Sequence, residues 1–368
     1  MKPQKKILFV LPTLHAGGAE NYALRFINYC KNEYVFYVIS INIEKGDLHN
    51  EFIKTGAKIY YQSTGYINPI KLFKFYNFLK NKKFDTICSF NGNFGGFPLL
   101  LAKLSGTQNR IAFYRRSTNA FGNNGLKVLY NNFVTFLIRK CATKILSNSE
   151  FAFINFHKNI YLSDARFGII SNGVDASKFN LNTSKEEARK QLNIAQNLFV
   201  IGHVGRFDPA KNHQTIFKAA KLLIKQNNDI LFLFCGRGTD SNNFKNELVK
   251  YSIQNNTKIL GLRDDVETVY RAMDIFYFPS VTEGQPNALI EAMFCGIPIA
   301  ASNIEPIKEA VPTQIFKHLV DPINVEHHLN LLQKIKEDID FREKLIQKEW
   351  AVKKFNRDFN FELFKQVI

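Results

Sequence analysis

The chain has 368 residues, 45% of them hydrophobic, and a formal net charge of +17 at pH 7. Its length exceeds a single ordinary hydrophobic core and predicts two domains, and its apolar content excludes intrinsic disorder. The five cysteines are scattered and form no CxxC pair, which argues against a disulfide framework or a zinc site and favours a cytoplasmic location. No run of 18 apolar residues is present, so the sequence predicts no membrane-spanning segment.

The first half of the chain predicts a series of parallel βαβ units, because short apolar runs alternate with segments of helical periodicity. Residues 7–11 are the first expected strand, after which Gly17 and Gly18 turn the chain into the first helix. Two glycines at this turn allow a phosphate or a sugar to approach the backbone, although a simple tight turn explains them equally well. Further strands are expected at 34–42, 57–62, 85–90, 110–115, 144–148 and 167–171.

The positive charge is concentrated in this first half. Residues 1–180 contain 24 Lys and Arg against 9 Asp and Glu, whereas residues 181–368 contain 25 against 23. Residues 69–83 and 126–144 mix apolar and basic side chains, as do helices that rest on anionic lipid. The alternative for both is an ordinary surface helix that packs its apolar face on the sheet. We expect an anionic partner here, and specifically an anionic membrane surface.

Arg115 and Arg116 follow a predicted strand and are candidates for a site that faces the other half of the chain, unless they are simply part of the basic surface. A polar stretch comes next and predicts a linker. The expected divisions are residues 1–178, a linker at 179–198, a second domain at 199–350, and a C-terminal helix at 351–368 that returns to the first domain.

A second βα series begins with a strand at 199–207 and a helix at 214–226, and strands are expected again at 230–238, 258–262, 274–280 and 298–302. Arg206 and Lys211 therefore lie at the carboxyl end of a parallel strand, where ligands bind in such folds. Two cations at this edge suit a diphosphate, although an isolated pair is more often ordinary surface charge.

Residues 282–296 predict a polar loop that leads into a short helix. Pro286 suits the first helical position, and Gly296 suits a left-handed stop after the helix. Glu283 in the loop and Glu291 in the helix are positioned to hold two ends of one ligand across the helix N-terminus, which attracts anions. The alternative to a ligand site is that Glu283 only interacts with the helix dipole and Glu291 is an ordinary surface residue.

Five motifs along nearly the whole chain resemble those of glycosyltransferase family 4, whose members are retaining enzymes that use nucleotide sugars and have the GT-B fold. They are Gly17-Gly18-Ala19-Glu20, Ser171-Asn172-Gly173-Val174-Asp175, Val204-Gly205-Arg206 with Lys211, Gly236-Arg237-Gly238, and Pro279-Ser280 followed by Glu283 and Glu291. The resemblance implies an α/β chain of two Rossmann-like doubly wound parallel-sheet domains that face each other across a cleft. The first domain would bind the acceptor, and the second the donor.

The resemblance also implies roles for individual residues. The expected catalytic residues are Arg206 and Lys211, which bind the diphosphate and stabilise the leaving group, and Glu283, which binds a hydroxyl of the transferred sugar. Glu291 would hold the ribose hydroxyls. The remaining expected donor contacts are Gly17, Gly18, Gly205, Gly236, Leu262, Arg263, Gly284, Gln285, Pro286, Asn287 and Ala288. Many members carry a histidine after the strand that precedes Arg115 and Arg116, and this chain has none there, which puts catalytic assignments in the first domain in doubt. The resemblance implies contact with an acceptor or a sugar for Arg115 or Arg116 instead.

The resemblance thus implies a metal-independent hexosyl- or N-acetylhexosaminyl-transferase without a cofactor, with a UDP-sugar as the favoured donor and a lipid-linked or oligosaccharide acceptor. We expect it on the cytoplasmic face of the plasma membrane, in the synthesis of capsule, exopolysaccharide or lipopolysaccharide. The alternatives are a GT-B sugar phosphorylase or nucleotide-sugar epimerase. A nucleic-acid-binding protein is disfavoured because no recognised binding motif is present.

Overall fold

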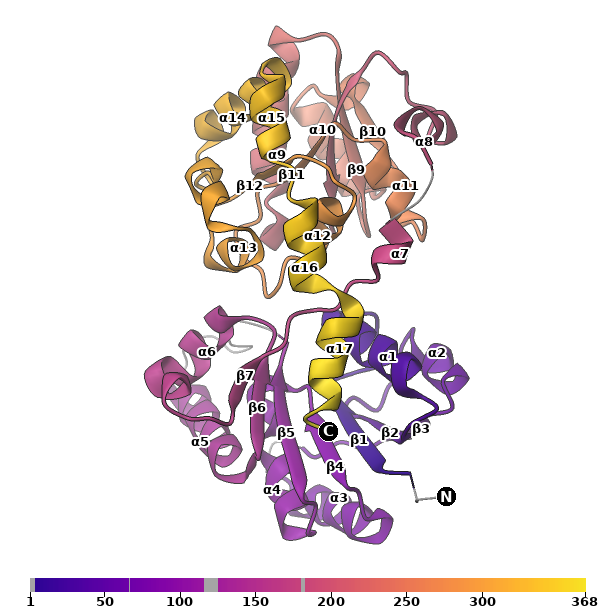
Figure 1. The fold of residues 1–368 in the computed structure, drawn as a ribbon, viewed down its shortest axis with the longest axis vertical. Coiled ribbons are helices and arrows are strands. Elements are labelled where there is room, and N and C mark those ends of the chain that lie inside the picture. The colour runs from indigo at the N-terminus through magenta and orange to yellow at the C-terminus, as the bar shows by residue number, and fades with distance from the viewer. Residues whose placement is uncertain (1–3, 66, 116–124, 180–182) are drawn as a thin grey trace. The chain divides into compact units, whose positions relative to one another are not determined.

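The computed structural model describes residues 4–65, 67–115, 125–179 and 183–368. It divides into an N-terminal unit, Met1–Gly173 with Asp358–Ile368, and a C-terminal unit, Val174–Arg357 (Figure 1). Each unit is built on one parallel sheet with helices packed against it, as the alternating pattern predicts.

The N-terminal unit contains a seven-stranded sheet in the order β3-β2-β1-β4-β5-β6-β7. Its strands are β1 (Lys6–Leu11), β2 (Val35–Ser40), β3 (Lys58–Tyr61), β4 (Thr86–Ser89), β5 (Asn109–Tyr114), β6 (Lys144–Ser147) and β7 (Phe167–Ile169). Its helices are α1 (Gly18–Cys30), α2 (His49–Lys54), α3 (Pro69–Lys82), η1 (Gly92–Gly95), α4 (Gly96–Leu104), α5 (Gly125–Cys141), α6 (Glu150–His157), η2 (Lys158–Leu162) and α17 (Arg357–Lys365). Every strand expected in this half is found.

Many phenylalanines of this unit form an aromatic core between the sheet and helices α1 and α17, and others, such as Phe75 and Phe153, belong to a second core cluster. The Phe26 ring of α1 lies 4.6 Å from that of Phe364 in α17, and Phe364 lies 5.2 Å from Phe113 in β5. The last residues of the chain therefore complete the core of the first unit.

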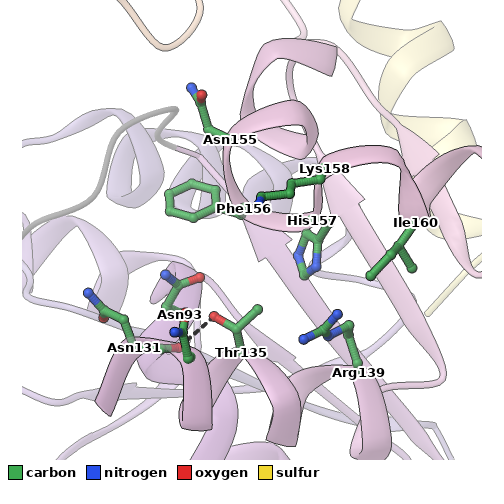
Figure 2. A pocket seen from close by; sticks show the side chains of 10 residues that line it. Asn93, Asn131, Thr135, Arg139, Asn155, Phe156, His157, Lys158 and Ile160 are labelled. Atoms are coloured by element: carbon green, nitrogen blue, oxygen red, sulfur yellow. Dashed lines mark hydrogen bonds between the residues drawn. The ribbon is translucent and has the colours of Figure 1, made fainter. Parts of the chain in front are cut away.

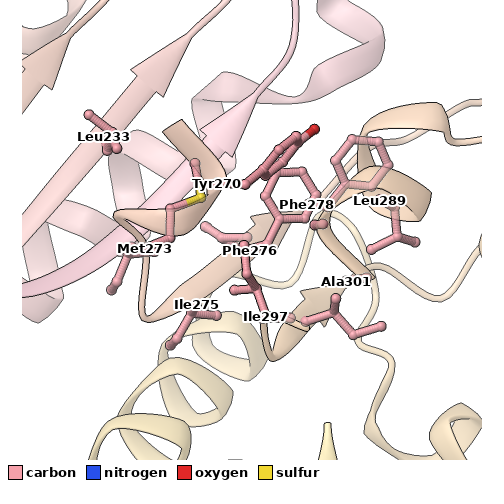
Figure 3. Close-up of a cluster of buried hydrophobic side chains, with 14 of the residues drawn as sticks. Leu233, Tyr270, Met273, Ile275, Phe276, Phe278, Leu289, Ile297 and Ala301 are labelled. Carbon is pink, nitrogen blue, oxygen red and sulfur yellow. The ribbon is translucent and has the colours of Figure 1, made fainter. Parts of the chain in front are cut away.

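The C-terminal unit contains a five-stranded sheet in the order β10-β9-β8-β11-β12. Its strands are β8 (Phe199–Val204), β9 (Ile230–Cys235), β10 (Thr257–Ile259), β11 (Ile275–Phe278) and β12 (Ile299–Ala301). Its helices are α7 (Ala176–Phe179), α8 (Lys185–Gln191), η3 (Pro209–Lys211), α9 (His213–Gln226), α10 (Asn242–Lys250), η4 (Gln254–Asn256), α11 (Val266–Arg271), α12 (Asn287–Phe294), α13 (Glu305–Ala310), η5 (Thr313–His318), α14 (Val325–Glu337), α15 (Ile339–Lys344) and α16 (Lys348–Phe355). Figure 3 shows its core around β11, where Phe276 and Phe278 pack near Tyr270 and Leu289.

The unit boundaries differ from the expected divisions in two places. Residues 185–191 of the expected linker form α8, which begins with a capping box between Ser184 and Glu187 and buries Ala188 in the C-terminal core. A polar composition predicts a linker, but a capping box followed by one apolar face is sufficient for a short packed helix. In the expected C-terminal helix, α16 belongs to the C-terminal unit and only α17 packs in the first.

Candidate active site

The loops that follow β8, β9 and β10 meet at the carboxyl edge of the C-terminal sheet. The amide of Gly205 donates to the carbonyl of Cys235 at 2.9 Å, and the amide of Gly236 donates to that of Gly261 at 2.7 Å. Phe207, further along the first loop, donates to the carbonyl of Arg237. These hydrogen bonds fix the three loops to each other before any ligand is present.

Two predicted donor-site glycines are required by this packing. Gly236 has a φ of +141°, and a Cβ added there would lie 2.2 Å from the carbonyl oxygen of Gly205. A Cβ at Gly205 would lie 2.8 Å from the imidazole Nε2 of His203 and 3.3 Å from Cγ of Lys211. Glycine at 236 lets the β9 loop touch the β8 loop, and glycine at 205 leaves room for the side chains of His203 and Lys211.

The predicted catalytic residues Lys211 and Glu283 form an ion pair between the β8 and β11 loops. The Lys211 ammonium donates to Glu283 Oε1 at 2.5 Å and lies 5.1 Å from the centre of the Phe278 ring. The exposed fractions of the two side chains are 18% and 9%. The sequence predicts both residues in the site but gives no indication that they pair.

Local structure holds this pair in place. Asp208 caps η3 by accepting from the amide of Ala210, and the carbonyl of Ala210 accepts from the amide of Val281 in the β11 loop. Asn212 ends η3 in the left-handed region, and its side-chain amide donates to the carbonyls of Pro279 and Pro322. The β8 and β11 loops are thus joined on both sides of Lys211.

Helix α12 follows the β11 loop, and its N-terminus receives no hydrogen bond from a capping side chain. Pro286 is expected at the first helical position but is the N-cap, so the helix begins one residue later, at Asn287. Gly296 adopts the predicted left-handed conformation after Cys295, with a φ of +73°. Gly284, Gln285, Asn287 and Ala288 lie in the loop and the first turn. The helix therefore presents backbone N–H groups at the same sheet edge as Lys211.

Tyr270, which the sequence reasoning does not identify, positions Glu291. Its hydroxyl lies 3.1 Å from Glu291 Oε2 and 3.0 Å from the carbonyl oxygen of Ala288. Burial and the neighbouring carboxylate raise the pKa of Tyr270 well above its usual value, so the phenol remains a donor. This contact joins α11 to α12 across the fold, and no local pattern in the sequence signals it.

The other predicted donor residues of this unit lie on the same edge. Arg206 follows β8 and is exposed, and Leu262 follows β10 with 67% of its surface exposed. Arg263 is held by Asp265 through two hydrogen bonds of 2.7 and 2.6 Å. The Arg206 cation and the apolar side chain of Leu262 are therefore the exposed groups that a nucleotide could contact at this edge.

The predicted residues of the N-terminal unit lie at the carboxyl edge of its own sheet. Gly17 precedes α1 in an extended conformation, and a Cβ added to Gly18 would meet nothing within 4 Å. Glu20 in the first turn of α1 is buried, and burial raises the pKa of its carboxyl group. A pocket of about 310 Å³ lies at this edge, lined by Pro12, Ile41, Asn42, Ser63, Thr64, Gly65, Asn91, Phe94, Phe97 and Tyr130.

Arg115 is packed into this unit rather than extended from its surface. Its guanidinium lies 3.8 Å from the centre of the Tyr22 ring and donates to the side chain of Asn172, and burial lowers its pKa to about 10. Its Nε and Nη1 find no hydrogen-bond partner among the described residues. Arg116 lies outside the described residues.

Two further observations concern residues outside this site. Asp338, part of an Asp-x-Asp sequence, caps α15 by accepting from the amide of Phe341. Across the described ranges, no three or more His, Cys, Asp and Glu side chains gather as a metal site would require, and no helix has the length and apolar composition needed to cross a membrane.

The sequence is similar to those of known proteins. Residues 184–350 match the family described as Glycosyl transferases group 1. The chain is 28% identical, over 73% of its length and 70% of the relative's, to the UDP-Gal:alpha-D-GlcNAc-diphosphoundecaprenol alpha-1,3-galactosyltransferase of Escherichia coli. It is also 28% identical to the capsular polysaccharide biosynthesis glycosyltransferase CapH of Staphylococcus aureus, over 94% of its length and 88% of the relative's.

Solved structures share the fold of this chain. Anabaena HepE in complex with UDP superposes with a TM-score of 0.82 over 98% of both chains at 18% identity. WaaG, described as a glycosyltransferase involved in lipopolysaccharide biosynthesis, has a TM-score of 0.73 over 98% of this chain and 99% of its own at 16% identity. The predicted pair of Rossmann-like domains in a GT-B chain is confirmed.

Proposed function

We propose that this protein, whose C-terminal unit is a group 1 glycosyltransferase domain in a GT-B chain, transfers a hexosyl or N-acetylhexosaminyl group from a nucleotide-diphosphate sugar to a lipid-linked glycan. A UDP-sugar is the favoured donor. The reaction retains the anomeric configuration, needs no metal, and serves the synthesis of capsule, exopolysaccharide or lipopolysaccharide. The relatives from Escherichia coli and Staphylococcus aureus, named for a diphosphoundecaprenol acceptor and for capsule, support this choice.

The observation that carries the proposal is the convergence of three groups at one sheet edge, with a fourth on the helix that follows. The Lys211–Glu283 ion pair, the exposed Arg206 and the N-terminus of α12 follow the carboxyl ends of β8 and β11, and the Glu291–Tyr270 contact lies further along α12. Cations and helix N–H groups suit a diphosphate, and carboxylates suit the hydroxyl groups on either side of it.

Each group then has one role in the transfer. Lys211, Arg206 and the N-terminus of α12 bind the diphosphate and stabilise the charge that develops on it. Glu291, held by Tyr270, accepts hydrogen bonds from the ribose hydroxyls, and Glu283 accepts one from the sugar. The bond from the anomeric carbon to the phosphate oxygen breaks, and a bond to the acceptor oxygen forms on the same face. The acceptor proton passes to the leaving diphosphate, so no protein base is needed.

Substitution of Lys211 and Glu291 tests this assignment. We expect Lys211→Met and Glu291→Gln each to reduce transfer at least about 100-fold, which corresponds to about 3 kcal/mol of transition-state stabilisation. Lys221→Met, which removes an exposed cation from α9, is the matched control and should leave transfer unchanged. Melting shifts with UDP-, GDP-, ADP- and TDP-sugars identify the donor, because a ligand bound by the folded state alone raises stability. Normal turnover in both variants excludes the assignment.

We further propose that helices α3 and α5 of the N-terminal unit rest on an anionic membrane. In α3, Phe75 and Leu79 are buried on the sheet, while Ile70 and Phe73 are 69% and 64% exposed beside exposed lysines. In α5 the exposed apolar side chains are Val128, Leu129, Phe133 and Phe136. Helix α4 packs between these two helices, so the exposed side chains belong to one layer.

Vesicle pelleting tests the membrane proposal. Wild-type protein should pellet with liposomes that contain anionic lipid and much less with neutral ones, because each basic residue near such a surface adds about 1 kcal/mol. Phe73→Ser should weaken pelleting, whereas Val249→Ser, which removes an equally exposed side chain from α10, should not. Equal pelleting with both kinds of liposome excludes the proposal.

A further inference from the structure

A second pocket, of about 500 Å³, lies between α5 and α6 of the N-terminal unit (Figure 2), and none of its described lining residues is among those assigned above. It is lined by Asn93, Asn131, Asn132, Thr135, Arg139, Asn155, Phe156, His157, Lys158 and Ile160. All of these residues except Phe156 and Ile160 carry an amide, hydroxyl or basic group. None of its described lining residues carries a carboxylate.

The part of the chain that the structure describes supplies no countercharge to the basic groups of this pocket. Among the described residues, no carboxylate lies within ion-pair distance of Arg139 or Lys158. Asp164, the nearest acid along the chain, is bound to Arg166. Lys158 follows the last residue of α6 with a φ of +48°, a conformation that side-chain-bearing residues seldom adopt. Two cations without countercharge favour an anionic ligand.

His157 is a buried polar group that faces the pocket without a partner. Its side chain lies among the rings of Tyr114, Phe153 and Phe167, and the residue is 2% exposed. Neither ring nitrogen has a hydrogen-bond partner among the described residues. Figure 2 shows the imidazole and the Arg139 guanidinium facing the same space.

The protonation state of His157 indicates what it can bind. Burial, and next the charge of Arg139, lower its pKa to about 4. At neutral pH the ring is therefore uncharged, with one donor and one acceptor nitrogen, which suits a hydroxyl group. Leaving such a group unsatisfied costs about 1–3 kcal/mol, and a ligand hydroxyl would remove that cost.

We propose that this pocket binds a sugar that carries a phosphate, with the phosphate on Arg139 and Lys158 and the sugar hydroxyls on His157 and the asparagine amides. The inference rests on the proposed function in one respect, because a lipid-linked glycan joins its first sugar to the lipid through phosphate. Helix α5 connects the two proposals. Thr135 and Arg139 face the pocket, while Phe133 and Phe136 of the same helix are exposed in the layer assigned to the membrane.

Calorimetric titration of the full chain tests the site, with N-acetylglucosamine 1-phosphate, the methyl glycoside of N-acetylglucosamine and inorganic phosphate as probes. The sugar phosphate should bind at least about tenfold more tightly than the glycoside, which is the value of one charge-assisted contact. Arg139→Gln should remove this advantage and leave the glycoside unaffected. Lys140→Gln, which changes the next residue and an exposed cation of α5, is the control and should alter neither Kd more than about twofold.

A second variant separates the two halves of the ligand. His157→Phe keeps an aromatic ring among the neighbours of His157. It should weaken the binding of both the sugar phosphate and the glycoside, and leave the binding of inorganic phosphate unchanged. If N-acetylglucosamine 1-phosphate binds wild type and Arg139→Gln equally well, or does not bind wild type, the proposal is wrong.

A short-chain prenyl diphosphate sugar distinguishes the two sources of the ligand. If Arg139→Gln raises KM for this acceptor without changing kcat, the ligand is the acceptor. If Arg139→Gln weakens only the binding of the free sugar phosphate, the pocket is a separate sugar-phosphate site, and the acceptor is excluded as its ligand. The melting shift with UDP-sugar is measured in the same variants. It reports the donor site alone, so a failure of the proposed function remains distinguishable from a failure of this site.

Discussion

Replacing Glu283 with Gln removes the negative partner of Lys211 and leaves an ammonium group in a place that water reaches poorly. Loss of one partner of a buried ion pair costs about 3–5 kcal/mol, whereas exposed pairs contribute about 0.2–1 kcal/mol. With side-chain exposures of 18% and 9%, this pair is close to the buried case. We therefore expect Glu283→Gln to lower the free energy of unfolding of the C-terminal unit by about 2 kcal/mol.

The same substitution should strengthen the binding of UDP. A diphosphate supplies the negative charge that Lys211 has lost, so part of the destabilisation is recovered in the complex. A recovery of about 1 kcal/mol lowers the Kd of UDP about fivefold. Transfer should nevertheless slow, because Glu283 no longer binds the sugar. Lys211→Met should weaken UDP binding instead.

Urea unfolding with and without UDP measures both effects. Trp350 is the single tryptophan of the chain, and its indole N–H donates to the carbonyl of Ala310 at 2.9 Å, so its fluorescence follows the C-terminal unit alone. Glu247→Gln, in an exposed pair with Lys250 on α10, is the control and should change stability by about 0.5 kcal/mol or less. If Glu283→Gln weakens UDP binding as Lys211→Met does, the pair does not exchange its charge partner for the diphosphate, and the reasoning fails.

Three further results are expected. Tyr270→Phe should raise KM for the nucleotide sugar about tenfold with little change in fold, because only the hydroxyl that holds Glu291 is lost; an unchanged KM argues against this role. Gly236→Ala should abolish the melting shift with UDP, because its Cβ would lie 2.2 Å from the Gly205 carbonyl oxygen; a preserved shift shows that the β8 and β9 loops tolerate displacement. Burial lowers the pKa of His213 from 6.5 to about 4. Between pH 6.5 and 4 the imidazole is therefore protonated in the unfolded chain but not in the folded one, so acidification through this range lowers the free energy of unfolding. This group contributes on the order of 3 kcal/mol at most. Unfolding followed by Trp350 fluorescence should show this loss of stability on acidification. His213→Phe, whose ring fits among Phe207, Phe217 and Phe244, should show a smaller loss. If the loss in His213→Phe equals that of wild type, other groups cause the pH dependence.

The strands, and the sheet edge at which the candidate donor residues lie, could be predicted because they are encoded locally. Apolar runs such as 7–11 mark buried parallel strands, and the end of each strand fixes where Arg206, Lys211 and Glu283 lie. Gly296 likewise signals the end of α12 by the conformation that it adopts. In such cases neighbouring residues in the sequence suffice for the prediction.

The parts that escaped prediction depend on contacts between distant residues. Tyr270 meets Glu291 only because α11 packs beside α12, and Lys211 meets Glu283 across 72 positions of sequence. The pocket of Arg139 and His157 requires α5 and α6 to lie together on the sheet. No spacing or periodicity in the sequence reports these approaches, since each is decided by the packing of whole helices.

The path of the chain through the two units has a consequence for synthesis on the ribosome. The C-terminal unit is one continuous segment, 174–357, whereas the N-terminal unit needs residues 358–368 as well. During translation the second unit is complete before the first one can close, and the surface of Phe26 and Phe113 that Phe364 covers stays open until then. A chain that lacks residues 358–368 therefore exposes an aromatic surface that chaperones can bind, and a released chain truncated before residue 358 should bind chaperones more strongly than the full chain.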